Sequence, residues 1–336
     1  MATIKDVARL AGVGVGTASR VISGKGSFSK GAAERVERAA RELGFRPSAI
    51  ARALSLQSTG TIGVFVPDFK GPFYGPLLDA IDAELRGHDR HMVAANGCGD
   101  IDSRQQSIDG VRFLIDRECD GIILCSNALR DADFLALRAA FPNIAVVNRE
   151  VRGMKSQCFS VDHRAAGRVA AEALLSNGHR RIAIISGPAA VGDNRQRLQG
   201  LHERLAEDGV DVAAIPTEEG DFSAASGWAA AERLLARKPD ITAVFCANDQ
   251  MAMGAMSCLQ GRGVAVPRKW SVLGYDDSDV AAFLSPRLST VHIPIADMGL
   301  NACRMLMNTR HGSALPVSRK FVPTLVMRDS LARARD

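Results

Sequence analysis

The stretch Thr3-Ile-Lys-Asp-Val-Ala-Arg-Leu-Ala-Gly-Val-Gly-Val-Gly-Thr-Ala-Ser-Arg-Val-Ile22 predicts two short helices joined by a tight turn. Thr3 stands three residues before Asp6, which is the spacing of a capping box at the start of a helix. Apolar residues follow at helical spacing as far as Gly12, and glycine allows the positive φ that a sharp turn needs. A second helix is expected from about Gly14 to Ile22. This pattern is typical of a helix-turn-helix, whose second helix enters the major groove of DNA.

Two further segments extend this N-terminal head. A third helix is expected to begin after Ser29 as its N-cap and to end before Gly44. Residues 48–54 predict a separate short helix. A helix of this length does not persist alone in water, because nucleation costs more than its few hydrogen bonds return. It therefore needs a partner in order to fold.

Basic residues concentrate in the same N-terminal part. Residues 1–58 contain ten lysines and arginines against four acidic residues, a net charge of +6, whereas the whole chain carries +5. The remainder is therefore close to neutral, at −1. A basic head on a near-neutral body is typical of contact with nucleic-acid phosphates.

After residue 60, short apolar strands alternate with helices, which indicates βαβ units and parallel sheets in an α/β fold. The expected strands are residues 61–67, 91–95, 121–125, 144–148, 181–186, 212–215, 242–246 and 271–275. The expected helices are residues 73–86, 104–117, 133–140, 165–176, 195–207, 225–236 and 251–262. The pattern occurs twice, which predicts two lobes with a ligand cleft at the carboxyl ends of the strands. Residues 289–330 are too few for a third lobe, so we expect them to cross back between the two.

Composition and motifs argue against several other classes of protein. The seven cysteines are widely spaced and form no C-x-x-C pair, which favours buried thiols in a reducing compartment. The chain shows neither a secretory leader nor a long apolar run, so we expect a cytoplasmic protein that does not span a membrane. The glycines at 12, 14 and 16 do not complete a dinucleotide-binding motif, and no hydrolase, zinc-protease or P-loop motif is present. We therefore expect no enzyme activity, no cofactor and no metal.

Several motifs occur along the chain in a characteristic order. They are Ala2 to Val13, Ser19-Arg-Val-Ile22, Pro47 to Leu54, Gly178-His-Arg-Arg-Ile182, Arg197-Leu-Gln-Gly200, Ala247-Asn-Asp249, Gly274-Tyr-Asp-Asp277 and Pro286 to Val291. In these motifs the chain resembles the lactose/galactose-repressor family over its whole length. Asn148-Arg-Glu150 and the segment from Val322 to Ser330 are similar to its galactose and β-glucoside repressor branch.

The resemblance implies a periplasmic-binding-protein-like core, homodimers or tetramers, and operator binding controlled by a small effector. The chain would be a repressor of carbohydrate-utilisation genes. Residues 1–46 would form the helix-turn-helix domain, residues 47–60 the hinge helix and linker, and residues 61–336 the effector-binding and dimerisation domain. No leucine heptad is present near residue 336, so we expect a homodimer.

The outward positions of the second helix are the candidate DNA contacts. Arg20 is the candidate base reader, because a guanidinium can bond guanine through two hydrogen bonds; the alternative is a phosphate contact or a solvated side chain. Val15 and Gly16 resemble the family's specificity pair, so direct reading there is limited to apolar contact. Thr17 and Ser19 are expected on phosphates. The expected DNA contacts are Thr3, Val15, Gly16, Thr17, Ser19, Arg20, Ala51, Arg52 and Leu54.

The short helix supplies the last three of these contacts by resemblance. Leu54 would be a wedge between base steps of the minor groove, Ala51 would lie against the groove, and Arg52 would meet phosphate. The same helix of a second subunit would be its protein partner. Effector binding would then separate the two copies and dissolve the helices. The alternative is a plain linker.

A sugar needs planar polar side chains for its hydroxyls and an aromatic face for its C–H surface. By resemblance, Arg197, Asn248 and Asp276 match the family's polar ligand contacts, and other positions match its cleft lining. The expected effector contacts are Asp68, Phe73, Tyr74, Asn148, Arg149, Asp162, Arg197, Phe222, Asn248 and Asp276. Asp68 has the alternative of a helix cap, and Arg197 with Asp276 that of a structural ion pair. Asp249 is expected to cap the helix that follows it.

The nature of the effector remains open between several chemistries. A set of Asp, Asn and Arg favours a neutral polyol. Arg149 and Arg197 would instead suit a phosphorylated sugar, and a purine is a further alternative. A sugar-binding transport protein would fit the body, but it would leave the basic head without a purpose.

Overall fold

A computed structural model describes residues 2–24, 26–45, 58–97, 103–237 and 239–335. These residues form two compact units, Met1–Thr61 with Glu118–Asp120, and Ile62–Arg117 with Gly121–Asp336. The expected short helix at 48–54, with Ala51, Arg52 and Leu54, lies outside the described residues.

The head is a helix-turn-helix followed by a third helix, as predicted. Its helices are α1 (Ile4–Ala11), α2 (Val15–Ser23) and α3 (Lys30–Glu42). Thr3 and Asp6 form the predicted capping box, and Gly12 has a φ of 63° in the turn. Val7 and Val36 are fully buried with Ala18 in a small core that joins the three helices. Gly14 begins α2 without a side-chain cap.

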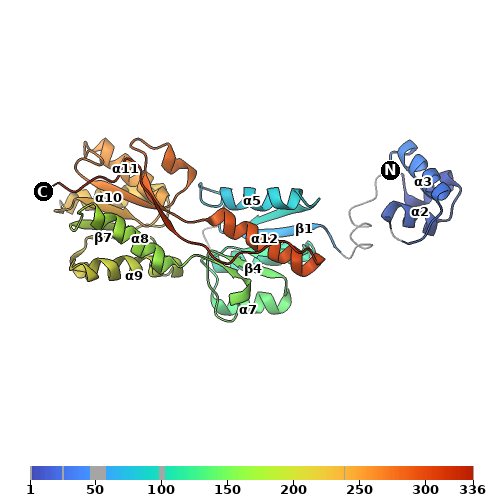
Figure 1. Cartoon of the computed structure of the whole chain (residues 1–336), viewed down its shortest axis with the longest axis horizontal. Coiled ribbons are helices and arrows are strands. Elements are labelled where there is room, and N and C mark those ends of the chain that lie inside the picture. The colour runs from blue at the N-terminus through green and yellow to red at the C-terminus, as the bar shows by residue number, and fades with distance from the viewer. Residues whose placement is uncertain (1, 25, 46–57, 98–102, 238, 336) are drawn as a thin grey trace. The chain divides into compact units, whose positions relative to one another are not determined.

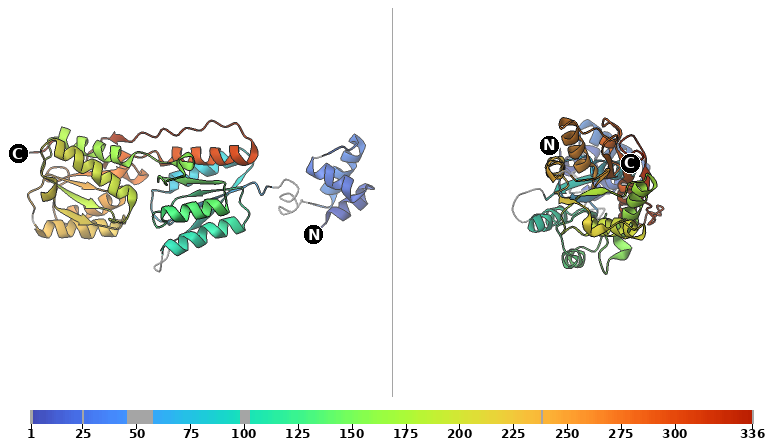
Figure 2. Two further views of the ribbon diagram at one scale, coloured as in Figure 1. Left: turned by 90° about the horizontal axis from the view of Figure 1, so that it is seen from below. Right: turned by 90° about the vertical axis from the view of Figure 1, so that its left-hand side faces the viewer.

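The first lobe of the body is a five-stranded sheet in the order β2-β1-β3-β4-β5. Its strands are β1 (Thr61–Val66), β2 (His91–Asn96), β3 (Gly121–Leu124), β4 (Ile144–Val147) and β5 (Cys158–Phe159). Its helices are α5 (Gly75–Arg86), α6 (Ser103–Asp116), α7 (Asp131–Ala140) and α12 (Ile295–His311). Helices α5 and α12 pack together on one face of the sheet, and α6 and α7 cover the other (Figures 1 and 2).

The second lobe is a six-stranded sheet in the order β11-β10-β9-β8-β6-β7. Its strands are β6 (Ile182–Ser186), β7 (Thr217–Glu219), β8 (Ala243–Cys246), β9 (Ser271–Asp276), β10 (Ser289–His292) and β11 (Thr324–Val326). Its helices are α8 (His163–Ser176), α9 (Gly192–Glu207), α10 (Ala224–Arg237) and α11 (Asp249–Gly261). All pairs are parallel except β10 with β11, which are antiparallel.

One predicted strand was wrong. Residues 212–215 contain a short 3-10 helix, Val212–Ala214, that Asp211 caps by accepting a hydrogen bond from the backbone N–H of Ala213. The strand of this βαβ unit is β7, where Glu218 is the buried residue. Glu218 is paired with Arg233 and Arg237 of α10, so this strand has no apolar pattern to reveal it.

Glycines set the helix packing in the second lobe. A Cβ on Gly200 of α9 would overlap the backbone carbonyl of Arg164 in α8, and one on Gly167 of α8 would overlap that of Arg197 in α9. Gly227 of α10 and Gly254 of α11 likewise lie against the backbone of the other helix. The backbones of each helix pair are therefore in direct contact, which leaves no room for a side chain at these positions.

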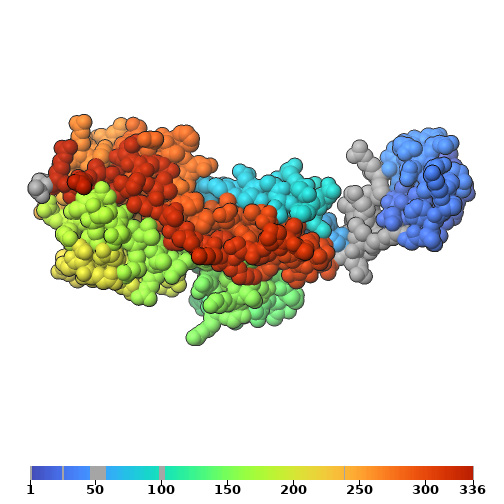
Figure 3. Space-filling model, viewed as in Figure 1, coloured from blue at the N-terminus to red at the C-terminus, as the bar shows by residue number. Residues whose placement is uncertain are grey.

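The chain crosses between the lobes three times. The first crossing leads from β5 to α8, the second from β10 to α12, and the third from α12 to β11. Figure 3 shows the C-terminal residues, in red, running over the surface of both lobes. This confirms the expectation that residues 289–330 cross back instead of forming a lobe of their own.

Asp120 holds the residues that lead into β1. Its carboxylate accepts hydrogen bonds from the Ser58 hydroxyl (2.6 Å) and from the backbone N–H groups of Thr59 (3.0 Å) and Gly60 (2.9 Å). The Thr59 hydroxyl also donates to the carbonyl of Glu118 at 2.9 Å. Because Asp120 directly precedes β3, these bonds tie the start of the body to the strand beside β1.

Candidate functional site

The two lobes enclose a cavity of about 270 Å³, here called the inner hollow. The first lobe contributes the loop after β1 and the ends of β3 and β4, and the second lobe contributes the ends of its strands and the start of α9. The inner hollow is lined by Pro67, Asp68, Lys70, Phe73, Tyr74, Asn127, Asn148, Val191, Asp193, Arg197, Asp221, Phe222, Asn248, Gln250 and Asp276. Eight of the ten expected effector contacts therefore meet here.

Arg197 is the central cation of this cavity. It is 3% exposed, and its guanidinium lies 3.5 Å from the centre of the Tyr275 ring. It donates a hydrogen bond to the carbonyl of Ala247, and its other terminal nitrogen lies 3.8 Å from the carboxylate of Asp193. Its Nε has no hydrogen-bond partner among the described residues. A buried donor without a partner is costly, so this atom favours a polar ligand.

His163 lies behind Tyr275 and was not singled out from the sequence. Its Nδ1 is 2.8 Å from the Tyr275 hydroxyl, and both side chains are buried. Burial lowers the pKa of His163 to about 4, so the ring is neutral at physiological pH. The pair supports the ring on which Arg197 stacks. The only sequence signal was its position next to Asp162 at the start of a helix.

Three lining residues have an unusual backbone. Asn148, Phe222 and Asp276 have φ values of 60°, 72° and 114°, in the left-handed region that side chains other than glycine rarely adopt. The Oδ1 of Asn148 is buried without a hydrogen-bond partner among the described residues. Burial raises the pKa of Asp276 well above its usual value, although Arg197 opposes this shift. Strained, buried polar groups around one cavity are typical of a ligand site.

Aromatic rings supply the apolar part of the inner hollow. Phe73 and Tyr74 both line it, with ring centres 4.9 Å apart in an edge-to-face arrangement. Phe222 lies on the opposite lobe, where Gly187 leaves room for its ring and Asn248 donates to its carbonyl at 2.9 Å. The cavity thus offers ring faces beside hydrogen-bonding groups, the combination that a sugar needs.

The cap of α11 is Asn248, so the expectation that Asp249 caps this helix was wrong. The Asn248 Oδ1 accepts from the backbone N–H of Met251 at 2.9 Å. The buried Asp249 instead accepts from the backbone N–H of Ser278 (2.8 Å) and from the Thr290 hydroxyl (2.6 Å). Burial raises the pKa of Asp249 to about 6, against the lowering effect of these bonds.

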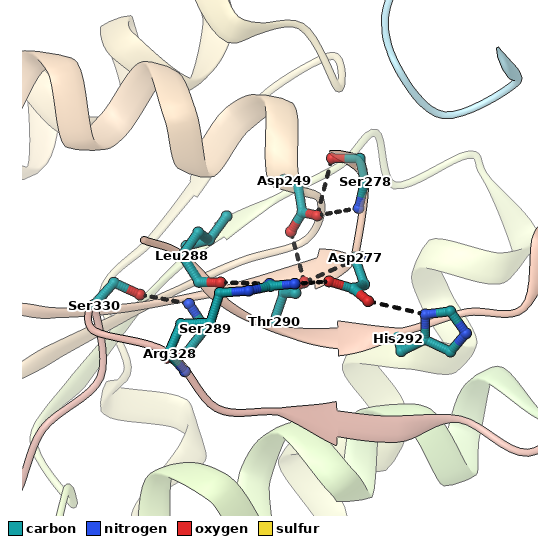
Figure 4. Close-up of polar contacts among 9 residues, drawn as sticks. All are labelled: Asp249, Asp277, Ser278, Leu288, Ser289, Thr290, His292, Arg328 and Ser330. Atoms are coloured by element: carbon teal, nitrogen blue, oxygen red, sulfur yellow. Dashed lines mark hydrogen bonds and ion pairs between the residues drawn. The ribbon is translucent and has the colours of Figure 1, made fainter. Parts of the chain in front are cut away.

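The network around Asp249 reaches the crossings between the lobes (Figure 4). Asp277, next to the lining residue Asp276, accepts from Arg328 at 2.7 Å and contacts His292 at 3.1 Å. These two partners lower the pKa of Asp277, with the His292 bond as the larger cause. His292 ends β10 at the second crossing, and Arg328 follows β11 after the third. Asp277, next to the second-lobe wall of the cavity, is therefore bonded to residues at the second-lobe ends of both crossings.

A second cavity of about 750 Å³, here called the outer hollow, adjoins the first and shares Pro67, Asp68, Asn127 and Val191 with it. Its other lining residues are Gly97, Ser103, Ser107, Ser126, Ala128, Leu129, Arg130, Asp131, Arg149, Ala190, Gly192 and Arg195. Arg149 therefore belongs to the outer hollow, where it is paired with Asp131 at 2.9 Å.

Of two aspartates expected to contact the effector, one lies away from both hollows and the other lines both. Asp162 is exposed, lines neither hollow, and caps α8 by accepting from the backbone N–H of Ala165 at 2.9 Å. Asp68 lines both hollows and accepts from the backbone N–H of Lys70 at 2.7 Å, so it orders its own loop and does not cap α5.

The expected DNA contacts of the head lie on α2, except for Thr3, which caps α1. Arg20 is exposed, and its guanidinium donates to the Thr17 hydroxyl at 3.3 Å. Gly26 approaches the stem of Arg20 and leaves space for it. Val15 and Ser19 are exposed on the same helix. Thr17 thus positions Arg20, a role that the sequence did not suggest.

Comparison with known proteins identifies the family. Residues 3–48 match the bacterial regulatory proteins of the lacI family, and residues 171–331 match the periplasmic binding protein-like domain. The HTH-type transcriptional regulator GalR of Escherichia coli is 35% identical over 99% of this chain and 96% of its own length. The chain belongs to the lacI family of transcriptional regulators.

Solved structures of this family have the same fold as the regulator. A lacI-family transcriptional regulator from Burkholderia phymatum is 43% identical, with a TM-score of 0.80 over 82% of this chain and 100% of its own. The lac repressor dimer bound to operator and the anti-inducer ONPF is 28% identical, with a TM-score of 0.86 over 98% of this chain and 99% of its own. The regulator is thus a DNA-binding protein with a helix-turn-helix head and a two-lobed α/β body.

Neither a metal site nor a membrane segment is found in the described part of the regulator. No group of three or more His, Cys, Asp or Glu side chains there could hold a metal ion. None of the described helices combines the length and the apolar character needed to cross a bilayer.

Proposed function

We propose that the regulator binds operator DNA as a homodimer and represses carbohydrate-utilisation genes in the cytoplasm, and that a sugar whose ring lies in the inner hollow controls this binding. We further propose that it has no catalytic activity, which is supported by its relatives being transcriptional regulators. The observation that best supports a ligand site is the lining of the inner hollow, where Arg197 and Asn148 have buried polar atoms without hydrogen-bond partners among the described residues.

The chemistry of the inner hollow favours the neutral ring of a sugar over an anionic group at this place. Four aspartates line it (Asp68, Asp193, Asp221 and Asp276), against the two cations Lys70 and Arg197. Carboxylates accept hydrogen bonds from hydroxyl groups but repel a phosphate. The edge-to-face pair of Phe73 and Tyr74 offers a surface for the C–H face of a sugar ring.

In the head, the proposed roles follow from exposure and charge. Arg20 would bond a guanine, Ser19 would contact phosphate, and Val15 would touch the methyl group of a thymine. Thr3 is exposed at the start of α1 and would contact phosphate there. The proposed minor-groove roles of Ala51, Arg52 and Leu54 concern residues outside the described ranges.

Control by the sugar would pass along the crossings. Ligand contact with Asp276 would act on the neighbouring Asp277, whose partners are His292, at the end of β10 before the second crossing, and Arg328, which follows β11 after the third. A change in the angle between the lobes would then move the residues that Asp120 holds at the entry to β1. This is a hinge motion of packed lobes coupled to a DNA-binding segment.

The test is operator binding with and without sugar. A DNA fragment selected by the full chain from a random pool would be titrated at constant salt, because salt changes DNA affinity strongly. Galactose, glucose, a β-glucoside and a disaccharide would first be screened by thermal shift, where a ligand at about 100 times its Kd adds about 2.7 kcal/mol of stability. The proposal predicts at least one sugar that both raises the melting temperature and changes the operator Kd. Absence of both effects with every sugar would contradict it.

A further inference from the structure

The outer hollow differs in chemistry from the inner one. Its described lining contains no aromatic side chain, whereas three aromatic rings line the inner hollow. It has instead three arginines and the Ser103 hydroxyl, because the hydroxyls of Ser107 and Ser126 already donate to the Ser103 carbonyl and to the Ser107 oxygen. A sugar ring would find no stacking surface there, but a small anionic group would find donors.

Of the three arginines that line the outer hollow, Arg130 and Arg195 have N–H donors without a partner among the described residues. Arg149 is neutralised by Asp131 at 2.9 Å, and it also donates to the carbonyl of Leu129. One terminal nitrogen of Arg195 donates to the carbonyls of Ala189 (3.1 Å) and Ala190 (2.7 Å), which carry no charge. Within the described residues, its Nε and second terminal nitrogen make no hydrogen bond, and its charge has no ion-pair partner.

Arg130 is the other arginine with unused donors. No hydrogen bond or ion pair of its guanidinium is found within the described part of the chain, although its charge helps to lower the pKa of Asp133. The carboxylate of Asp133, which accepts from the Arg130 backbone N–H, is already held by two nitrogens of Arg104 at 2.8 and 2.5 Å. Arg130 and Arg195 are both exposed to solvent in the outer hollow.

These two arginines come from opposite lobes. Arg130 directly precedes α7 in the first lobe, and Arg195 lies in the first turn of α9 in the second. With Arg149 and Asp131 paired, Asp68 is the one remaining acid among the described residues that line the outer hollow. An excess of positive charge therefore faces the outer hollow from both sides, next to a cavity suited to a sugar ring.

We infer that the effector is a carbohydrate carrying an anionic group, a carboxylate or a phosphate, with its ring in the inner hollow and its anionic group between Arg130 and Arg195. An anion there would accept charge-assisted hydrogen bonds from both guanidinium groups. It would also remove the repulsion between two like charges and so favour the approach of the lobes. This inference rests on the proposed function and makes its sugar class more specific.

Asp68 and Asn127 lie between the site of the ring and the site of the anionic group. Both residues line both hollows, so the two hollows adjoin there, and we expect the ligand to extend from one into the other. The outer hollow, at about 750 Å³, has room for an anionic substituent or a second, acidic sugar unit. The asymmetry in charge fixes the orientation: the acidic inner hollow takes the neutral ring and the basic outer hollow takes the anion.

The test compares matched neutral and acidic sugars by calorimetry on the full chain. The probes are glucose with glucuronate and glucose 6-phosphate, galactose with galacturonate and galactose 1-phosphate, and inorganic phosphate alone. We expect one acidic member to bind about tenfold or more tightly than its neutral parent, with a preference that falls as salt is added. Comparing the sugar carboxylates with the sugar phosphates shows which of the two anionic groups the regulator binds.

The variants Arg130→Gln and Arg195→Gln should each remove most of this preference while leaving the affinity for the neutral parent within about threefold. Arg112→Gln is the matched control, because Arg112 is an exposed arginine of α6 that lines neither hollow. Acidic sugars that bind no better than their neutral parents would overturn the inference and leave the proposed function intact. Inorganic phosphate that alone binds as tightly as the acidic sugars would overturn it in the same way. No binding by any sugar, neutral or acidic, would overturn both.

Discussion

The two walls of the cleft are built differently. On the second-lobe side, the wall residues Arg197 and Asn248 and, behind them, Asp249 are buried, and each is bonded to the protein by more than one contact. On the first-lobe wall, Asp68, Phe73 and Tyr74 are partly exposed and belong to the loop between β1 and α5. We therefore expect the second-lobe wall to be preorganised and the first-lobe wall to adapt to a bound ligand.

This difference assigns a separate task to each wall. A preorganised set of buried donors and acceptors discriminates between ligands, because any group left unpaired there is costly. A loop with fewer contacts can close over the bound ligand. At its tip, the backbone of Gly71, at a φ of 81°, lies against the side chain of Gln250 in the opposite lobe. We therefore expect substitutions behind the second-lobe wall to have the larger effects.

The largest expected effect is that of Gly200→Val. A side chain at this position must displace the backbone of Arg164, so α9 separates from α8 and the wall that carries Arg197 is lost. Unfolding in urea should show a loss of about 3 kcal/mol. The matched change on the first-lobe side is Gly75→Ala, where nothing lies near the added atom, and it should alter stability by less than about 0.5 kcal/mol. Equal stability of the two variants would contradict the packing described here.

The second prediction uses pH to detect two buried titrating groups behind the second-lobe wall, Asp249 and His163. The raised pKa of Asp249, about 6 in place of 3.8, means that stability is present at pH values below its usual pKa and is lost as pH rises through 6. The lowered pKa of His163, about 4 in place of 6.5, means that stability is present above pH 6.5 and is lost as pH falls through 4. Each contribution amounts to about 3 kcal/mol, and they oppose each other.

Variants should separate these opposing slopes. Between pH 4 and 6.5, Asp249→Asn should make stability rise more steeply with pH than in the wild type, and His163→Gln should make it rise less or fall. The difference in slope is about 1 kcal/mol per pH unit in each case. Urea midpoints measured across this pH range give the result. Slopes identical to that of the wild type in both variants would show that neither group is buried as described.

The third prediction compares one cation from each wall. Arg197→Gln removes a buried charge that contacts Asp193, Tyr275 and Ala247, and it should weaken binding of the best sugar about 100-fold. Lys70→Gln removes an exposed charge from the opposite wall and should cost about fivefold or less. Calorimetry on both variants gives the ratio. A larger loss for Lys70→Gln would reverse the roles of the two walls.

The smallest effect concerns a residue that acts through another. His163→Leu leaves the Tyr275 hydroxyl buried without its partner, so the ring under Arg197 loses its support, and sugar affinity should fall about tenfold. His163→Gln, which can still bond the hydroxyl, should restore affinity to within about threefold. In an Arg197→Gln background the same leucine change should cost less than about twofold. Additive losses would show that His163 does not act through Arg197.

The sequence predicted the elements whose signals are local. The capping box of Thr3 and Asp6, the turn at Gly12, and the alternation of strands and helices each depend on residues a few positions apart. The strand at β7 was missed because its buried residue is Glu218, whose burial depends on arginines in α10. Local periodicity cannot report a partner supplied by another element.

The same limit applied to the candidate site. Asn248 and Asp249 are adjacent and either can cap a helix, so only the contacts of Asp249 with Ser278 and Thr290 decide between them. His163 and Tyr275 are 112 positions apart, and no local sequence pattern predicts the hydrogen bond between them. Arg149 and Arg197 were both expected to contact the effector, and only the folded lobes show that Arg197 lines the inner hollow and Arg149 the outer one.

The most direct test of the account is the operator Kd of the full chain, measured by fluorescence anisotropy at fixed salt, without ligand and with the best-binding carbohydrate at saturation. The account predicts a change of about tenfold or more, in one direction, which corresponds to a coupling free energy of about 1.4 kcal/mol. Arg197→Gln should abolish this change while leaving the ligand-free Kd as in the wild type. A wild-type operator Kd that stays the same at saturating carbohydrate would contradict the account.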